Sequence, residues 1–358
     1  MQLSLQKIKK PLHLFQRLFL LCITPLITFL LIACAPIQAK NNPSGAYNYP
    51  VSPDRTNLKY MQIQVQGSIA IKPAKVDSLP VYELSGQAWD EDEQILYAIS
   101  DEGLLYHLKV TLTNNILTDA KIISAFQLKD INGLPLSGKY SDSEGLSIIK
   151  GNNGKKGDAE LVISFENMPR ITRYSTQGEI LGKVKIPRKI SKRKYFRHKN
   201  KALESVTVHP KYGILTAAEY PLKSHKLTEQ TIYSSSGKEW HFPTAKAKNS
   251  SITSLEILEN GDVLVLERAY VNPLIPIVIN LSRVSLDECD ATQRCKKEII
   301  AHFNGADGWL LDNFEGLAHY RGNQYFLVSD NNKNPLQKTL IILFEVLENK
   351  TSTPQEKP

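Results

Sequence analysis

From Tyr60 onward, the apolar positions of this chain fall in short segments in which they alternate with polar residues. The segment Met61-Gln62-Ile63-Gln64-Val65 is typical, and long apolar stripes with a 3.6-residue period are absent from the sequence. Alternation with a period of two is the pattern of a strand that buries one face. The pattern predicts an all-β chain whose folded part covers residues 60–348.

One short strand recurs five times, and its starts lie 59, 60, 49 and 62 residues apart. A second strand follows each copy and ends in an acidic residue 14 to 22 positions after the start of the first. A period near 50 to 60 leaves room for four short strands, which fits a blade of a β-propeller. The copies begin at Ser85, Glu144, Glu204, Thr253 and Glu315, and the second strands end at Asp101, Glu166, Glu219, Glu267 and Asp330.

These repeats predict a single β-propeller of about five four-stranded blades. In the second repeat all four strands are visible, at residues 144–150, 160–166, 171–175 and 179–186. Small residues such as Gly145 and Ser147 suit an innermost strand, because these strands converge on the axis. Pairing of residues 61–71 with 339–347 would close the ring and leave no exposed sheet edge. Six blades are the alternative, if residues 61–75 and 104–128 contribute more sheet.

The first 33 residues have the pattern of an export signal, because four cations precede an uncharged apolar run from Leu18 to Ala33. The run ends in Leu31-Ile32-Ala33-Cys34, which resembles the bacterial lipobox, so we expect lipidation of Cys34 and removal of the leader. Ala35 in place of Asp favours the outer membrane, facing the periplasm. A transmembrane anchor is the alternative, but 16 residues interrupted by Pro25 fall short of the ~20 needed. Residues 34–59 are predicted to form a flexible tether and residues 349–358 a disordered tail.

Charge and cysteine content narrow the choice of partners. The formal net charge is +8, and loss of the four leader cations leaves +4, so charge does not indicate a nucleic-acid partner. Cys289 and Cys295 flank a five-residue polar loop. In an exported protein this spacing predicts a disulfide, and a metal site made of two thiols without neighbouring histidines is the alternative.

The repeated acids are predicted to collect at one mouth of the central channel, because the start of the first strand lies beside the end of the second in an antiparallel hairpin. Carboxylates so close together raise one another's pKa or require a cation between them. Calcium fits, since it takes six to eight oxygen ligands in flexible geometry. The alternative is that the acids accept hydrogen bonds from backbone amides at blade junctions. The candidate ligands are Asp101, Glu144, Glu166, Glu204, Glu219, Glu267, Glu315 and Asp330, with Glu256 deeper in the channel.

A basic loop is predicted beside this mouth. Residues 183–201 contain ten Lys or Arg residues and end just before Glu204. Such a loop could bind phosphate or another anion, or it could be solvated or attracted to anionic lipid headgroups. The candidate substrate-binding residues are Arg170, Arg197, Lys201 and Arg268.

The motifs in residues 85–103, 142–147, 200–205, 253–268 and 313–332 together resemble the phytase-like family described as having esterase-like activity. The resemblance covers about Tyr82 to Val346, and Ala202 stands where relatives often have Gly. It implies a propeller related to calcium-dependent phytases that acts on phosphate esters.

On this reading, calcium activates the phosphate and a water molecule, and Glu204 and Glu219 are the candidate catalytic carboxylates. The alternative is a non-catalytic module that binds an anionic glycan, a lipid headgroup or a protein. The sequence contains no Gly-x-Ser-x-Gly motif, so it gives little support to a serine hydrolase. We expect a monomer.

Overall fold

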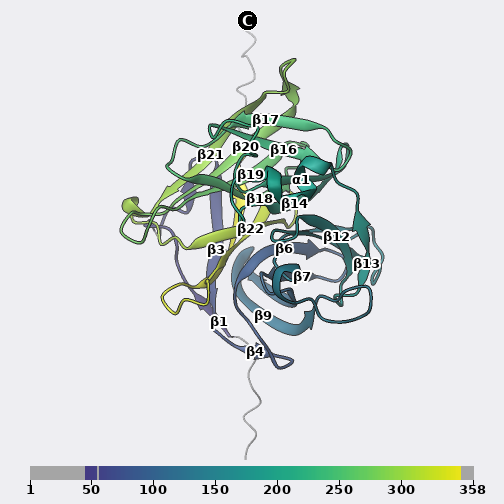
Figure 1. The fold of residues 1–358 in the computed structure, drawn as a ribbon. Coiled ribbons are helices and arrows are strands. Elements are labelled where there is room, and N and C mark those ends of the chain that lie inside the picture. The colour runs from purple at the N-terminus through teal and green to yellow at the C-terminus, as the bar shows by residue number, and fades with distance from the viewer. Residues whose placement is uncertain (1–44, 55, 348–358) are drawn as a thin grey trace, which may run out of the picture. The chain divides into compact units, whose positions relative to one another are not determined.

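The computed structural model describes residues 45–54 and 56–347, which form a five-bladed β-propeller (Figure 1). The predicted leader, Cys34 and the C-terminal tail lie outside these residues. Within the described part of the chain, no helix is long and apolar enough to cross a membrane.

Four of the blades are each built from four consecutive antiparallel strands, ordered from the axis outward. The strands of the second blade match the predicted ones to within about two residues at each end. The first blade contains β6 (Leu84–Asp90), β7 (Ile95–Ser100), β8 (Leu104–Thr113) and β9 (Ile116–Gln127), and the second contains β10 (Ser143–Ile149), β11 (Glu160–Phe165), β12 (Arg170–Ser175) and β13 (Ile180–Val184). The third contains β14 (Leu203–His209), β15 (Gly213–Ala218), β16 (Glu229–Ser234) and β17 (Glu239–Pro243), and the fourth contains β18 (Ser250–Ile257), β19 (Val263–Ala269), β20 (Val278–Cys289) and β21 (Cys295–Asn304).

The fifth blade closes the ring as predicted. It combines β22 (Asn313–His319), β23 (Gln324–Asp330) and β24 (Thr339–Val346) with β3 (Ile63–Ile71) from the other end of the chain. Two short strands, β1 (Ala46–Asn48) and β2 (Lys59–Tyr60), pair with β3, while β4 (Lys75–Val76) and β5 (Leu79–Pro80) form a small hairpin. The ring has five blades and not six, because residues 104–127 form the outer hairpin of the first blade.

The prediction of a tether over residues 34–59 is wrong for its described part. Val51 is 2 % exposed and belongs to the apolar core between the fourth and fifth blades. Tyr49 donates its backbone N–H to Ser68. The chain therefore joins the folded domain near Ala46, because apolar side chains in this segment find a place against the outer strands.

The innermost strands β6, β10, β14, β18 and β22 contact one another in cyclic order around the axis. Their small residues are required by this contact. A Cβ on Gly145 would lie 2.6 Å from the backbone nitrogen of Val206, and one on Gly86 would lie 2.6 Å from the carbonyl oxygen of Glu144. The apolar cores lie between neighbouring blades, as where Ile99 and Leu146 pack in one cluster.

Candidate functional site

Every inner hairpin carries a β-bulge at the same position of the repeat. The register between the first and second strands of each blade shifts by one residue there, so the first strand has a residue without a direct partner. A bulge re-aims a side chain and is often found beside functional sites. The bulged segments contain the residues at which the repeats begin, namely Ser85, Glu144, Glu204, Thr253 and Glu315.

The register also defines which residue of the second strand lies opposite the start of each bulge. The second-strand partners of the residues just before the bulges are Ser100, Phe165, Ala218, Glu267 and Ser329. The equivalent rim position is the next residue in each case. These positions are occupied by Asp101, Glu166, Glu219, Arg268 and Asp330.

In the fourth blade the rim position is therefore held by Arg268, and the assignment of Glu267 to the rim is wrong. Successive side chains of a strand point to opposite faces, so an error of one residue moves the carboxylate off the rim. Glu267 is fully buried, forms an ion pair with Lys297 and accepts a hydrogen bond of 2.9 Å from the backbone of Ala245. These partners satisfy its charge.

Carboxylates from four blades converge at this end of the axis. We call the seven acids of the bulge and rim positions the acidic mouth: Asp101, Glu144, Glu166, Glu204, Glu219, Glu315 and Asp330. Acids at this end form three groups of three residues. In each group, one carboxylate oxygen from each residue lies within 4.8 Å of the oxygens from the other two residues. The groups are Asp101, Glu144 and Glu315; Asp142, Glu144 and Glu166; and Glu166, Glu204 and Glu219. Glu144 belongs to two groups and so connects the first, second and fifth blades.

Two residues of this site were missed by the sequence reasoning. Asp142 joins Glu144 and Glu166 in one group. Asn313 donates from Nδ2 to Glu315 at 2.8 Å and to Asp330 at 3.1 Å, which connects the two predicted neighbours. Both residues precede a bulge acid by two positions, a spacing that places side chains on the same face of a strand.

Among the described residues, Arg268 and Lys201 are the cations that form ion pairs with acids of the mouth. Arg268 donates to Glu315, and its Nη2 lies 3.8 Å from Oε1 of Glu219. Lys201 donates from Nζ to both carboxylate oxygens of Glu219, at 2.7 and 2.6 Å. Burial lowers the pKa of Arg268, but Glu315 and Glu219 outweigh it and raise the pKa above its ordinary value.

On the other side of the mouth the acids face mainly one another. Burial raises the pKa of Glu144 well above its ordinary value, and the charges of Asp101 and Glu204 raise it further. Burial and the neighbouring Asp142 raise the pKa of Glu166 to about 8. Burial and Glu315 similarly raise the pKa of Asp330 to about 8. Raised pKa values are expected where carboxylates are buried beside one another with no cation between them.

The structure gives Arg170 and Arg197 structural contacts instead of places at the mouth. The guanidinium of Arg170 stacks 3.6 Å from the ring centre of Phe165 and donates to the carbonyl of Met168. Arg197 donates to the carbonyl of Pro221 at 3.0 Å and to that of His225. These contacts leave Arg268 and Lys201 as the predicted cations that touch the acidic mouth.

The basic loop is ordered and docked on the propeller. It contains α1 (Arg188–Ser191) and a 3₁₀ turn, and its apolar residues Ile190 and Phe196 are buried. Arg193 donates to the carbonyl of Asn167 at 2.8 Å, which ties the loop to the second blade. The loop ends at the mouth as predicted, through the contact of Lys201 with Glu219.

Glu256 lies near the opposite end of its strand and is not part of the acidic mouth. Its carboxylate accepts hydrogen bonds from Thr207 at 3.1 Å and from the backbone of His319 at 3.1 Å. It lines a cavity of about 660 Å³ together with Ser147 and Val208, which lie toward the ends of β10 and β14 away from the mouth. Its hydrogen bonds and position give it no role as a ligand at the mouth.

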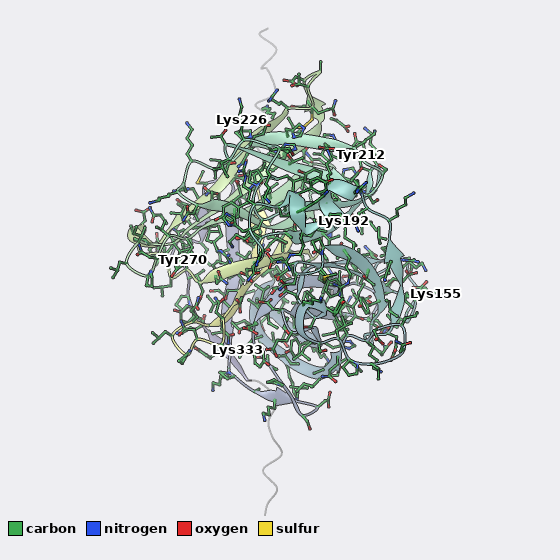
Figure 2. The ribbon with its side chains drawn as sticks, viewed as in Figure 1. Lys155, Lys192, Tyr212, Lys226, Tyr270 and Lys333 are labelled. Carbon is green, nitrogen blue, oxygen red and sulfur yellow. A yellow bond between two sulfur atoms is a disulfide. The ribbon has the colours of Figure 1, made fainter. Side chains whose placement is uncertain are left out.

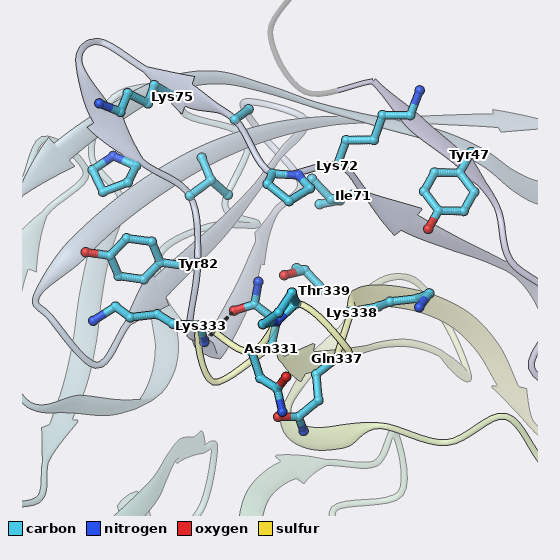
Figure 3. Close-up of a pocket in the computed structure, with 16 residues that line it drawn as sticks. Tyr47, Ile71, Lys72, Lys75, Tyr82, Asn331, Lys333, Gln337, Lys338 and Thr339 are labelled. Atoms are coloured by element: carbon cyan, nitrogen blue, oxygen red, sulfur yellow. Dashed lines mark hydrogen bonds between the residues drawn. The ribbon is translucent and has the colours of Figure 1, made fainter.

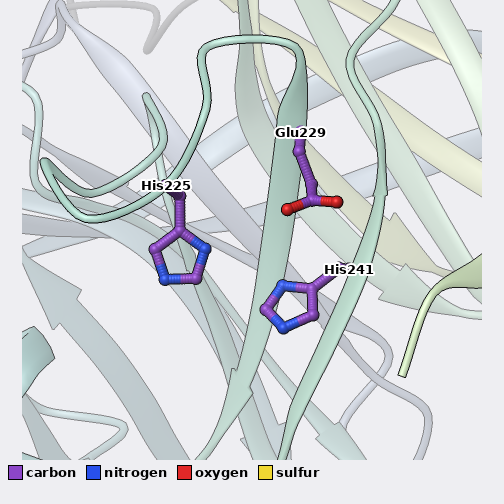
Figure 4. Close-up of side chains that lie close together, drawn as sticks. All are labelled: His225, Glu229 and His241. Carbon is purple, nitrogen blue, oxygen red and sulfur yellow. The ribbon is translucent and has the colours of Figure 1, made fainter. Parts of the chain in front are cut away.

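A second polar cluster lies on the third blade, where the rings of His225 and His241 and the carboxylate of Glu229 turn toward one another (Figure 4). The hydroxyl of Thr231 lies 2.9 Å from Nδ1 of His241 and 3.5 Å from Nδ1 of His225. Glu229 accepts a 2.8 Å hydrogen bond from Arg294. The cluster is therefore held by protein partners. Arg294 belongs to a loop that is closed by a disulfide. This disulfide joins Cys289 and Cys295, which confirms the predicted pairing.

The fold and site define a β-propeller whose inner hairpins bring carboxylates from several blades to one end of the axis. The model of the phytase-like family, described as "Esterase-like activity of phytase", matches residues 79–333. The chain therefore belongs to this phytase-like family.

Other comparisons add little to this assignment. The curated proteins include no match to the chain. Among solved structures, the PQQ-bound aldose sugar dehydrogenase of Streptomyces coelicolor is 11 % identical, with 80 % of this chain and 99 % of that chain covered and a TM-score of 0.38. A chain of the mitotic checkpoint complex is 10 % identical, with 95 % and 100 % covered and a TM-score of 0.38. The Cps50 (Swd1) propeller domain of Myceliophteria thermophila is 10 % identical, with 85 % and 100 % covered and a TM-score of 0.35.

Proposed function

We propose that this protein is a calcium-dependent phosphoric ester hydrolase, held at the outer membrane by a lipid on Cys34 and facing the periplasm. The observation that supports the proposal is the sharing of Glu144 between two carboxylate groups whose oxygens lie within 4.8 Å of one another. Arg268 and Lys201 lie on the adjoining side of the same mouth. Positive charges beside a cation site are what a phosphate ester requires.

The donor atoms fit calcium. The groups around Glu144 offer carboxylate oxygens alone, which suit a hard cation that takes six to eight oxygen ligands. Asp101, Glu144, Glu166 and Asp142 would hold the ion, because the ion pairs of Arg268 and Lys201 are made with Glu219 and Glu315 instead. A bound cation would also relieve the repulsion that raises the pKa values of these acids. Calcium would supply polarisation of the phosphoryl oxygens and a lowered pKa of a bound water molecule.

The chain's own cations have a different task in this proposal. Arg268 can form two parallel hydrogen bonds with phosphate oxygens through its planar guanidinium, and Lys201 can act as a second point charge. Lys201 is the more accessible, with 36 % of its side chain exposed against 12 % for Arg268. Glu219 contacts both cations, so it acts as a positioning residue. Glu204 lies beside it and completes the same group.

The proposal is tested by measuring phosphate release from a panel of phosphate esters with calcium and then with a chelator. Glu144→Gln should abolish release while the fold is retained. Glu256→Gln is the matched control, because Glu256 is a carboxylate of an inner strand that lies outside the mouth. Release that persists in chelator would remove the role of the metal. Absence of release, together with saturable calorimetric binding of inorganic phosphate, would instead identify a non-catalytic binding module.

A further inference from the structure

The direction of the strands places two kinds of connection at the end that carries the acidic mouth. Each first strand begins and each second strand ends at the mouth. The loops from second to third strands, and from each fourth strand to the next blade, therefore lie at this end. We call the surface formed by these loops the mouth face. The turns between first and second strands and between third and fourth strands form the opposite face.

The most exposed large apolar side chains of the described residues are all on the mouth face. Leu274 is 93 % exposed, Leu336 is 84 % exposed and Ile131 is 82 % exposed, and these belong to three different blades. The next three are Leu134 at 61 %, Leu227 at 59 % and Tyr270 at 50 %. Exposed apolar residues that gather on one surface mark an interaction site, whereas exposed apolar residues without such a role are scattered over both faces.

Exposed lysines lie on the same face as these apolar tips. They come from four of the five connections between blades and from loops within the third and fifth blades, and Figure 2 shows Lys192, Lys226 and Lys333 as examples. The turns of the opposite face mix both signs of charge, as in the sequence Glu91-Asp92-Glu93 beside Arg321. The exposed lysines of the mouth face are Lys72, Lys75, Lys139, Lys185, Lys192, Lys194, Lys199, Lys223, Lys226, Lys246, Lys248 and Lys333.

A hollow of about 710 Å³ opens on the same face between the fifth and first blades (Figure 3). Four lysines line it: Lys72, Lys75, Lys333 and Lys338. Three of them lie over aromatic rings, with Lys333 4.4 Å from the ring centre of Tyr82, Lys338 5.5 Å from that of Tyr49 and Lys72 6.0 Å from that of Tyr47. A hollow with this lining is suited to a small anionic group.

The chain also enters the folded domain at this end. Ala46 pairs with Ile71, at the end of β3 that lies beside Thr339, the first residue of β24. Since β24 begins at the mouth face, Ala46 lies there too. Ala46 lies twelve positions after Cys34, so the two residues cannot be more than about 43 Å apart.

We propose that the mouth face docks on an anionic membrane surface, with Leu274, Leu336 and Ile131 entering the headgroup region and the exposed lysines of the same face contacting lipid phosphates. Apolar side chains combined with basic residues are the combination that binds peripheral proteins to such surfaces. The acidic mouth does not oppose this arrangement, because Glu144, Glu204 and Glu315 are only 7 to 8 % exposed while the lysines project. The acidic mouth then faces the lipid headgroups.

The experiment uses the mature lipidated chain on vesicles of phosphatidylglycerol and phosphatidylcholine. A single cysteine carrying an environment-sensitive fluorophore is introduced by Leu274→Cys, by Leu336→Cys or, as the control on the opposite face, by Lys155→Cys. The native pair Cys289 and Cys295 is closed in a disulfide and does not take the label. On anionic vesicles we expect the labels at 274 and 336 to be several-fold less accessible to iodide than the label at 155.

Charge and orientation give further readouts. Added salt or vesicles of phosphatidylcholine alone should reduce the protection, because charge attraction is screened or removed. Equal accessibility of all three labels on anionic vesicles would overturn the proposal, since the lipid alone would then tether a freely oriented domain. Failure of the chain to float with anionic vesicles would also overturn it.

Discussion

The second and fourth blades have the same inner hairpin but opposite charges at the rim. In both, a paired residue precedes the bulge on the first strand, and the rim position is the residue that follows its partner on the second strand. The second blade has Glu144 and Glu166 at these positions, and the fourth has Thr253 and Arg268. The same backbone geometry therefore places two carboxylates, which require a cation, in the second blade and an arginine, which provides one, in the fourth blade. A five-fold backbone repeat can in this way hold a site that is not symmetric.

The largest effect should follow removal of the internal cation by Arg268→Met. Glu219 and Glu315 would lose a buried partner, and such a loss costs about 3–5 kcal/mol of unfolding free energy. Urea unfolding in chelator measures it, and calcium should restore part of the loss. The control is Arg294→Met, because that side chain is 55 % exposed and an exposed ion pair contributes less than about 1 kcal/mol. Equal stability of Arg268→Met and the parent protein would contradict the comparison.

Calcium affinity should distinguish the two sides of the mouth. Glu144→Gln removes a carboxylate shared by two groups, and we expect the dissociation constant to rise on the order of 100-fold. Glu204→Gln acts on the side of the internal cations and should raise it about tenfold or less. Isothermal titration calorimetry measures both constants. Equal losses of calcium affinity in the two variants would mean that the position of the ion in the mouth does not depend on Arg268.

Stability without calcium should fall as the pH rises. The pKa values of Glu166 and Asp330 are raised to about 8 in the folded protein, so between their unfolded values and pH 8 the folded state binds more protons than the unfolded state. The resulting stabilisation is complete below about pH 4 and is lost as the pH passes through the folded values. In chelator, the melting temperature should decrease from pH 5 to pH 9. Saturating calcium should flatten the profile, and an unchanged slope would argue against binding at these acids.

The smallest effect is expected at the two hydroxyl residues of the bulges. Ser85 donates to Asp101 in the first blade, and Thr253 donates to the carbonyl of Phe314 at 3.1 Å. Ser85→Ala and Thr253→Val should each cost about 0.5–1.5 kcal/mol of unfolding free energy. Only Ser85→Ala should also weaken calcium binding, because only Ser85 contacts a carboxylate of the uncompensated side. Thermal unfolding and calorimetry separate the two effects.

The repeat made much of the fold predictable. Small residues such as Gly86 and Gly316 identified the inner strands because their backbones approach a neighbouring blade too closely for a side chain. The register of one strand pair was not predictable to the residue. An acid and a base are adjacent at Glu267 and Arg268. Because the repeats were matched by their acidic residues, Glu267 was predicted at the rim position that Arg268 occupies. Contacts between distant loops, such as that of Lys201 with Glu219, also depended on how the basic loop packs.

The sequence by itself determined the propeller, the strand pair that closes the ring, the disulfide and the gathering of acids at one end of the axis, while it left five or six blades open. Each of these follows from a periodic pattern or from a spacing along the chain. The tertiary structure alone decided that Arg268 enters the mouth, that Glu267 pairs with Lys297, that Glu256 lies at the other end, and that the exposed apolar loops share one face. These features depend on register and on the approach of distant segments, because a shift of one residue reverses the direction of a side chain.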